Sequence, residues 1–226
     1  FCDDMGVDTI EIGGTLGVLM EAGKIPWGDK EAVMKAMNEM KEGTGFGSVV
    51  GNGAKLAGEK YNVHRVPVAR GQAMPAYDPR AIKGMGCTFA TSPMGADHTA
   101  GATSLPGIDH TKIDGQLQLS AGQQIGAAIC DSMMCMFGWY AFGFAPQTQQ
   151  LLVDLIKPMY GVEWTLEDMM NLGKSTLAKE YKFNEGAGIK LEDYKIADFM
   201  YEEKSPASNS TFDLKEEDAQ KYVNSF

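Results

Sequence analysis

The sequence predicts a mainly α-helical protein with little sheet. Apolar residues recur at helical spacing in several segments, whereas the strict alternation of apolar and polar residues that marks a strand is nearly absent. At 226 residues, 44% of them hydrophobic, the chain can bury a sizeable core in one large or two small domains. A loop-rich segment around Ile82 is the expected boundary, which places residues 1–82 in one helical unit and residues 83–226 in another.

The first helix that the pattern predicts follows Asp29. Three apolar residues lie at positions i, i+4 and i+7, namely Val33, Met37 and Met40. Asp29 is a typical N-cap and Gly43 a typical stop, so an amphipathic surface helix is expected between them.

A longer helix is predicted from about Gly115 to Phe144. After Ile125 this segment, which includes Trp139, is apolar nearly all round, and such a helix is usually buried on most sides. We therefore expect it to form the centre of the fold.

Two further helices are predicted after this segment. Residues 147–159 carry an apolar face made of Leu151, Leu152, Leu155 and Met159. Thr165 and Asp168 then resemble a capping box, which predicts the start of the next helix. That helix carries Met169, Met170, Leu172 and Leu177.

The remaining segments show weaker patterns. Short strand-like alternation occurs at Val63–Val68, so the sheet should be small. Residues 101–115 are irregular and are expected at the surface or along an access path. From Lys204 onward the composition turns polar and charged, which predicts a poorly packed tail.

Composition excludes several classes of protein. A formal charge of −10 argues against sequence-independent binding of nucleic acid, which requires Lys and Arg at the phosphates. No apolar run approaches the roughly 18 residues of a membrane-spanning helix, and no basic-then-apolar leader opens the sequence, so we expect a soluble, cytoplasmic protein without a membrane partner. The four cysteines show no disulfide spacing and no second close pair for a zinc site.

The segment from Gly71 to His98 is the most informative one for function. It reads GQAMPAYDPRAIKGMGCTFATSPMGADH and is rich in proline, glycine and polar side chains instead of a repeating apolar face. Proline fixes φ, and glycine permits close backbone approach or positive φ. A segment of this composition is expected to hold a ligand.

This segment closely resembles the PAYDPR…KGxGxxxATSxxGADH pattern of the aldehyde ferredoxin oxidoreductases, enzymes that carry tungsten on two pterins beside an iron–sulfur cluster. The later run LLVDLIKPMYGVEWTLEDMM is also similar to that family, and the resemblance extends over nearly the whole chain. It implies that residues 1–82 are part of the family's middle helical domain and residues 83–226 its C-terminal helical domain. A sequence that begins at Phe1 instead of Met agrees with a piece of a longer protein.

The opening FCDDMGVDTIEIG resembles the first of the family's two pterin-binding elements. The resemblance implies cofactor-binding roles for Asp3, Gly6 and Asp8. Carboxylates can accept hydrogen bonds from the N–H groups of a pterin, and the glycine lets the backbone come close. The alternative interpretation is a polar turn that leads into a helix, which is the commoner meaning of such a run.

The run CDSMMCMF takes the place of the second element. The resemblance implies that Asp131 contacts a pterin and that Cys135 is the fourth thiolate of a [4Fe–4S] cluster. The two residues are four positions apart where the family has five, so a continuous helix would turn one of them away. The alternative for Cys135 is a small buried apolar residue, and Cys130 is a second candidate without support from the family.

His98 closes the ATSPMGADH run. The resemblance implies that it lies beside the metal, where an imidazole can polarise an aldehyde oxygen or move a proton. The alternative is a histidine that satisfies a buried backbone group, the role expected of His64 and His110. Asp97 is a secondary candidate that would orient the His98 ring, and Arg80 would either clamp a pterin phosphate or pair with Asp78.

The resemblance implies an oxidoreductase that converts aldehydes to carboxylic acids. Its cofactors would be a tungsten (or molybdenum) bis-pterin group and a [4Fe–4S] cluster. Its partners would be an aldehyde substrate, ferredoxin or a similar electron carrier, and the N-terminal part of the same protein. The resemblance is also compatible with a homo-oligomer. A related carboxylate or acyl-CoA reductase and a cofactor-free helical remnant are the alternatives.

Overall fold

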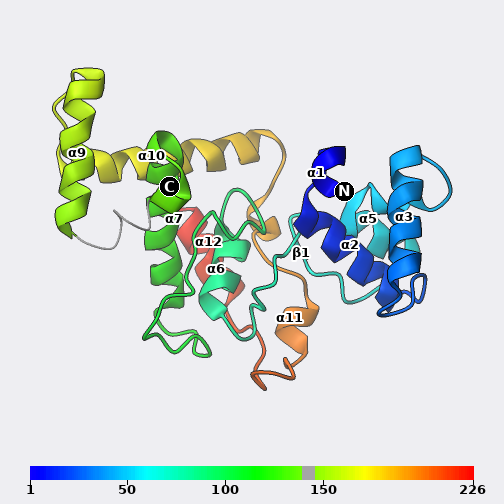
Figure 1. The fold of residues 1–226 in the computed structure, drawn as a ribbon. Helices are drawn as coiled ribbons and strands as arrows, with labels where there is room; N and C mark the ends of the chain where they lie inside the picture. The colour runs from blue at the N-terminus through cyan, green and yellow to red at the C-terminus, as the bar shows by residue number, and fades with distance from the viewer. Residues whose placement is uncertain (139–145) are drawn as a thin grey trace.

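The computed structural model describes residues 1–138 and 146–226 and confirms the mainly α class (Figure 1). Its elements are α1 (Cys2–Met5), α2 (Thr9–Glu21), α3 (Lys30–Glu42), α4 (Gly47–Val50), α5 (Gly53–Tyr61), β1 (Val68–Ala69), β2 (Gln72–Ala73), α6 (Lys83–Thr91), α7 (Gln116–Met133), α9 (Pro146–Tyr160), α10 (Leu166–Gly186), the 3₁₀ helix η1 (Leu191–Asp193), α11 (Phe199–Glu202) and α12 (Glu216–Val223). Within the described ranges, no helix has the length and apolar character needed to cross a membrane.

The first five helices pack together at one end of the molecule, around a cluster that includes Leu19, Met37 and Val50 (Figure 1). Helix α3 confirms the prediction made from its caps. The Asp29 carboxylate accepts a hydrogen bond from the backbone N–H of the third helical residue over 3.0 Å, and Gly43 ends the helix at φ +66°.

Glu11 ties this group of helices to the hairpin. Its carboxylate accepts from the backbone N–H of Ala54, at the start of α5, over 2.8 Å and from that of Ala73, in β2, over 2.7 Å. One side chain on α2 therefore satisfies backbone donors of two other elements, which fixes their relative positions.

The sheet is smaller than the sequence suggested. The expected strand Val63–Val68 is wrong except for its last residue, since the N–H groups of Val66 and Val68 bond two residues back as turns do. Strands β1 and β2 form an antiparallel hairpin whose turn residues, Arg70 and Gly71, have φ of +48° and +89°. Positive φ at both central positions matches the twist of a tight hairpin.

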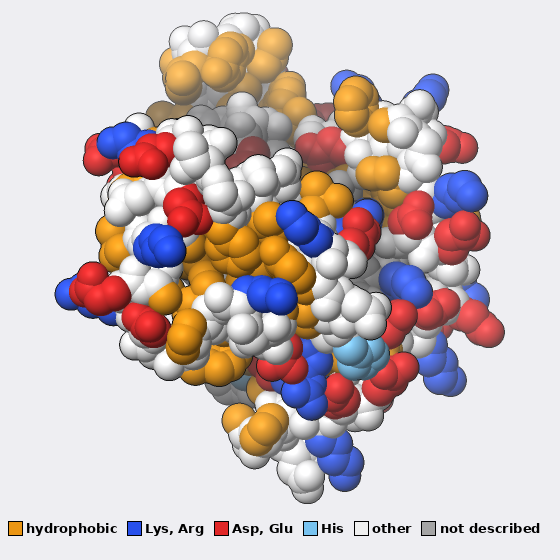
Figure 2. Space-filling view, turned by 90° about the vertical axis from the view of Figure 1, so that its right-hand side faces the viewer, with side chains coloured by type: hydrophobic (Ala, Val, Ile, Leu, Met, Phe, Trp, Pro, Cys, Tyr) orange, Lys and Arg blue, Asp and Glu red, His pale blue; other side chains and the backbone are white. Residues whose placement is uncertain are grey.

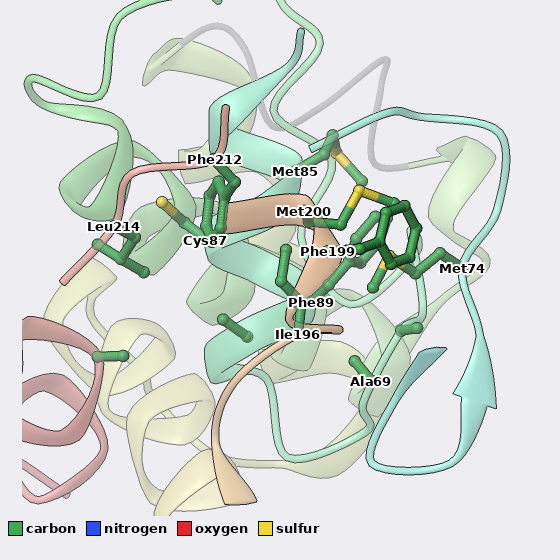
Figure 3. Close-up of a cluster of buried hydrophobic side chains, with 13 residues drawn as sticks. Ala69, Met74, Met85, Cys87, Phe89, Ile196, Phe199, Met200, Phe212 and Leu214 are labelled. Carbon is green, nitrogen blue, oxygen red and sulfur yellow. The ribbon is translucent and has the colours of Figure 1, made fainter. Parts of the chain in front are cut away.

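Helix α6 lies in the middle of a hydrophobic cluster that includes Met85, Phe89 and Phe212, and all nine residues of the helix are buried. Figure 3 shows side chains from α6, α11 and the segment before α12 converging on one another. Gly86 is required for this packing, because a Cβ there would come within 2.5 Å of the Phe212 ring and 2.8 Å of Pro79.

Helix α7 begins where the sequence predicted but ends early. The expected continuous helix to Phe144 is wrong, because Met134 is extended at φ −161° and ψ 174°. Its N–H still donates to the Cys130 carbonyl oxygen over 2.7 Å, as the last helical bond does. After Ile125, the buried side chains are those of residues 126–130, and the side chains from Asp131 to Gly138 are half-buried or exposed. Trp139 and Phe144 lie outside the described residues.

Helix α9 confirms the helix predicted over residues 147–159, but its apolar face is divided. Leu152 is buried, whereas Leu151 and Leu155 are 52% and 51% exposed and Met159 is 68% exposed. In Figure 1 α9 stands away from the body, and in Figure 2 it is the uppermost projection, with hydrophobic side chains on its surface. Its inner side packs on Met169 of α10.

Helix α10 starts at the predicted capping box. The Thr165 N–H donates to the Asp168 carboxylate over 2.8 Å, and the Asp168 N–H donates to the Thr165 hydroxyl over 3.2 Å. The helix crosses α7 closely at Gly173, where a Cβ would lie 2.6 Å from the Ile125 carbonyl oxygen.

The expectation of a poorly packed tail after Lys204 is wrong. Phe212 and Leu214 are only 1% and 6% exposed and belong to the same cluster as α6. The Phe212 N–H donates to the Met200 carbonyl oxygen over 2.8 Å. Polar composition concealed a few well-spaced apolar side chains, and those suffice to anchor the segment.

Candidate functional site

His98 lies on the loop that follows α6. Its ring stacks on that of Tyr77 at a centroid distance of 5.7 Å and an interplanar angle of 27°. Its Nδ1 atom is buried and has no hydrogen-bond partner among the described residues. A shielded, unpaired imidazole nitrogen can exchange a hydrogen bond or a proton with a ligand.

Asp97 does not orient this ring. Its Oδ1 atom lies 3.8 Å from His98 Nδ1, beyond hydrogen-bonding distance. The same oxygen accepts from both the N–H and the hydroxyl of Thr99 over 2.7 Å. The carboxylate therefore shapes the turn after His98, as an Asx turn does.

Arg80 forms the structural ion pair that was one of its two expected roles. Its Nη2 donates to Asp78 Oδ2 over 2.9 Å and its Nε to Asp78 Oδ1 over 3.0 Å. Burial raises the pKa of Asp78, but the hydrogen bonds and charge of Arg80 outweigh it and hold that pKa below its ordinary value. The pair makes the segment before α6 rigid.

A pocket of about 240 Å³ lies between α7, α10 and the segment after α6. Asp131, the residue expected to contact a pterin, stands at its edge in the last turn of α7, and Glu180 faces it from α10. Burial raises the pKa of both carboxyls, and the charge of Asp131 raises that of Glu180 further. The charge of Asp97 also raises the pKa of Asp131, and Ala100, two residues after His98, lines the pocket, which places the His98 loop beside it.

Gln124 also lines the pocket, and the sequence analysis missed it. Its side chain is 1% exposed, and Nε2 donates to the hydroxyl oxygens of Thr91 and Ser120 over 2.9 and 3.0 Å. Oε1 has no hydrogen-bond partner among the described residues. Polar residues one turn apart in a buried helix were the available signal, because such groups need partners.

Neighbouring hydrogen bonds fix which way the Gln124 amide points. The Thr91 hydroxyl donates its proton to the Cys87 carbonyl oxygen over 2.7 Å, so toward Gln124 it can only accept. The reverse orientation would set the amide oxygen 2.9 Å from an oxygen with no proton to give. The unpaired acceptor is therefore a consequence of the network and not an arbitrary assignment.

The two candidate thiols differ in accessibility. Cys135 is exposed and lies past the end of α7, whereas Cys130 is fully buried and its Sγ donates to the Met134 carbonyl oxygen over 3.4 Å. Because Met134 leaves the helix, the four-residue spacing from Asp131 does not impose a helical direction on Cys135. Across the described ranges, no three His, Cys, Asp or Glu side chains come together as a metal site.

The residues of the first element lie where α1 turns into α2. Gly6 ends α1 at φ +67°, and Asp8 is the N-cap of α2, accepting from the Glu11 N–H over 2.9 Å. Asp3 is exposed in the first turn of α1. Asp8 therefore caps α2, as expected for a polar turn that leads into a helix. The Asp3 side chain is exposed and accessible to a ligand.

The other two histidines differ from each other, and His110 shares with His98 a buried Nδ1 that has no hydrogen-bond partner among the described residues. His110 Nε2 lies 3.0 Å from the Leu105 carbonyl oxygen, and His64 Nε2 lies 3.3 Å from a carboxylate oxygen of Glu202. His110 has the role expected of it, because its ring contacts a backbone carbonyl, whereas His64 is exposed and pairs with a carboxylate instead of a buried backbone group. His98 is the histidine that the fold brings next to the acceptor-lined pocket.

Comparison with known proteins gives one family. The family described as aldehyde ferredoxin oxidoreductase, domains 2 and 3, matches residues 1–225. The chain is 27% identical to the tungsten-containing aldehyde ferredoxin oxidoreductase of Pyrococcus furiosus, over 83% of this chain and 34% of that protein. It is 26% identical to the proteins of the same name from Pyrococcus horikoshii, over 84% and 35%, and Thermococcus kodakarensis, over 83% and 34%. The chain spans about a third of the length of these curated relatives.

Proposed function

Because this chain belongs to the aldehyde ferredoxin oxidoreductase family, as its domains 2 and 3, we propose that the protein containing it oxidises aldehydes to carboxylic acids. The overall change is RCHO + H₂O → RCOOH + 2 H⁺ + 2 e⁻. A tungsten (or molybdenum) ion held by two pterins would supply the two-electron chemistry when bound. The residues of this chain would bind the pterins, position the aldehyde and move protons.

His98 is the proposed catalytic residue. Its Nδ1 is buried and unpaired among the described residues, and the stack on Tyr77 holds the plane of the ring. An imidazole in this setting can donate a hydrogen bond to an aldehyde oxygen or accept a proton from the water that becomes part of the acid. This unpaired nitrogen, in the run that resembles the family pattern, is the observation that carries the proposal.

The residues present fit a pterin, which is rich in N–H donors. Asp131 stands exposed beside the unpaired acceptor of Gln124, and Asp3 is exposed beside the positive-φ turn at Gly6. We assign Asp3, Gly6, Asp8 and Asp131 to pterin contacts, and Asp8 also holds the start of α2 by accepting from the Glu11 N–H.

Cys135 is the proposed ligand to a [4Fe–4S] cluster, through which electrons would pass to ferredoxin or a similar carrier. Its thiol is exposed past the end of α7 and can reach a cluster whose other ligands come from the rest of the protein. The N-terminal part of the protein is therefore a proposed partner of this chain.

We further propose that the chain consists of two helical domains, residues 1–82 and residues 83–226, and that the protein is located in the cytoplasm.

The decisive experiment uses the intact protein purified without oxygen. We expect tungsten or molybdenum together with iron, and reduction of a viologen dye that depends on added aldehyde. Protein that carries no such metal when it is supplied would contradict the proposal and favour a cofactor-free remnant. Metal-loaded protein that reduces carboxylates or acyl-CoA but does not oxidise aldehydes would favour the related reductase.

A further inference from the structure

A hollow of about 720 Å³ lies beside the C-terminal half of α10. Side chains of α10, of the loop that leads into η1 and of the end of α12 line it. It shares no lining residue with the pocket of Asp131 and Gln124, and the proposed function uses none of its residues. Clefts of this volume commonly hold small organic ligands.

Three aromatic rings meet in this hollow. The centroid of the Tyr181 ring lies 5.7 Å from that of Tyr194 and 5.2 Å from that of Phe226. The Tyr181 hydroxyl donates to the Thr91 carbonyl oxygen over 2.9 Å, so the polar end of this side chain is turned into the fold. Phe226 and Leu191, which also lines the hollow, are 37% and 38% exposed. A ligand with an aromatic body would cover this apolar surface and pack against the rings.

Lysines border the same hollow. Lys179, Lys182 and Lys190 line it with a single acidic side chain, that of Glu185, although the formal charge of the whole chain is −10. Lys179 and Lys182 lie three positions apart on α10, and neither has an ion-pair partner among the described residues. Lys190 lies 3.4 Å from Glu192, but both side chains are 72% exposed, so water screens that pair. The hollow can therefore offer positive charge to a ligand.

We propose that this hollow binds an aromatic organic anion, with its ring against Phe226 and its anionic group beside Lys179 and Lys182. An inorganic anion would leave the apolar surface uncovered and would contact only exposed lysines, where solvent screens the attraction. A neutral aromatic molecule would gain nothing from the lysines, and a cation would be repelled by them. This site goes beyond the proposed oxidation, which assigns no ligand to this part of α10.

The test is a calorimetric titration of the intact protein, purified without oxygen, with naphthalenesulfonate. This probe is fully ionised at neutral pH and is not a product of aldehyde oxidation. We expect a Kd below about 1 mM, because the rings leave water while the sulfonate lies beside two lysines. Naphthalenesulfonamide with the same substitution has nearly the same shape but no charge, and it should bind at least about fivefold more weakly. Added salt should weaken the binding of the sulfonate and not that of the sulfonamide.

Variants at exposed positions separate this hollow from the rest of the helix. Lys182→Gln should weaken sulfonate binding about fivefold or more, whereas Lys174→Gln, the same change at an exposed lysine of α10 outside the lining, should leave it unchanged. Leu191→Glu brings a like charge to the apolar surface and should weaken binding about tenfold or more. Thermal unfolding without ligand confirms that each variant is folded.

Three results would overturn the proposal. The first is equal binding of the sulfonate and the sulfonamide. The second is unchanged affinity in Lys182→Gln and Leu191→Glu, and a lower melting temperature alone in Lys182→Gln would show that the lysine only stabilises the end of α10. The third is no binding by the intact protein, since the rest of the protein would then cover the hollow. Aldehyde oxidation is measured alongside, and its absence would count against the proposed function and leave the binding result standing.

Discussion

Arg70 donates a hydrogen bond from Nη1 to the Ala90 carbonyl oxygen, 2.8 Å away, at the C-terminal end of α6. Its Nη2 donates to the carbonyl oxygens of Phe89, over 3.2 Å, and Ser92. The guanidinium also lies 4.6 Å from the centroid of the Tyr194 ring. One cation therefore satisfies carbonyls that a helix end leaves unpaired and complements the negative end of the helix dipole.

Replacing Arg70 should destabilise the fold. Arg70→Met leaves buried carbonyls of α6 without donors, so we expect the free energy of unfolding to fall by about 2–3 kcal/mol in denaturant titrations. Arg65→Met is the control, because Arg65 is exposed and solvent screens its ion pairs with Glu21 and Glu203, so its loss should change stability much less. Equal losses in the two variants would contradict this role for Arg70.

Replacing His98 should stop turnover without loss of metal. We expect His98→Ala in the intact protein to lower the rate of aldehyde oxidation by about 10²–10⁴-fold, the range typical of a lost acid or base. Tungsten or molybdenum and iron contents should stay near normal. His64→Ala, at an exposed histidine beside Glu202, should keep the wild-type rate. A His98→Ala enzyme with wild-type turnover would remove the catalytic role.

Replacing Cys135 should release the iron–sulfur cluster. Cys135→Ser is expected to lower the iron content and the cluster signal in electron paramagnetic resonance, because serine is a poor substitute for a thiolate ligand. Cys130→Ser keeps a donor for the Met134 carbonyl oxygen inside the core and should retain the cluster. The opposite result, with iron lost only from Cys130→Ser, would move the ligand role to Cys130.

Alanine substitutions at two glycines should change the stability of the fold in opposite directions. Gly86→Ala forces a Cβ to 2.5 Å from the Phe212 ring, so the free energy of unfolding should fall by about 1–3 kcal/mol. Gly122→Ala, inside α7 with no heavy atom within 4 Å of the new Cβ, should raise it by about 0.5–1 kcal/mol. Thermal unfolding of both variants measures the difference, and losses in both would show that α7 is more crowded than described.

Glu180 should make stability depend on pH. Burial and the charge of Asp131 raise its pKa above the ordinary 4.5, so the folded state binds more protons than the unfolded state between the two pKa values. Stability is therefore lost as the pH rises through that range. Glu180→Gln should melt higher than wild type at pH 7, with the difference shrinking toward pH 4. An equal, pH-independent gain in Glu185→Gln would trace the effect to net charge instead.

Local signals in the sequence predicted much of the secondary structure. Asp29 and Gly43 bound α3, and Thr165 with Asp168 starts α10, because capping depends on residues within a few positions of each other. The resemblance in the run that ends at His98 likewise identified the family. Each of these features lies within a short stretch of chain, so the sequence alone contains all the residues that form it. The roles of the proposed site residues remain predictions.

Tertiary structure decided what depends on distant partners. The sequence could not show that Phe212 packs on α6, that α7 stops at Met133, or that Arg70 reaches the end of α6. It could not show the unpaired acceptor of Gln124 either, since that depends on where the protons of neighbouring hydroxyls go. Packing and hydrogen-bond satisfaction are sums over groups far apart in the chain, and only the folded arrangement brings those groups together.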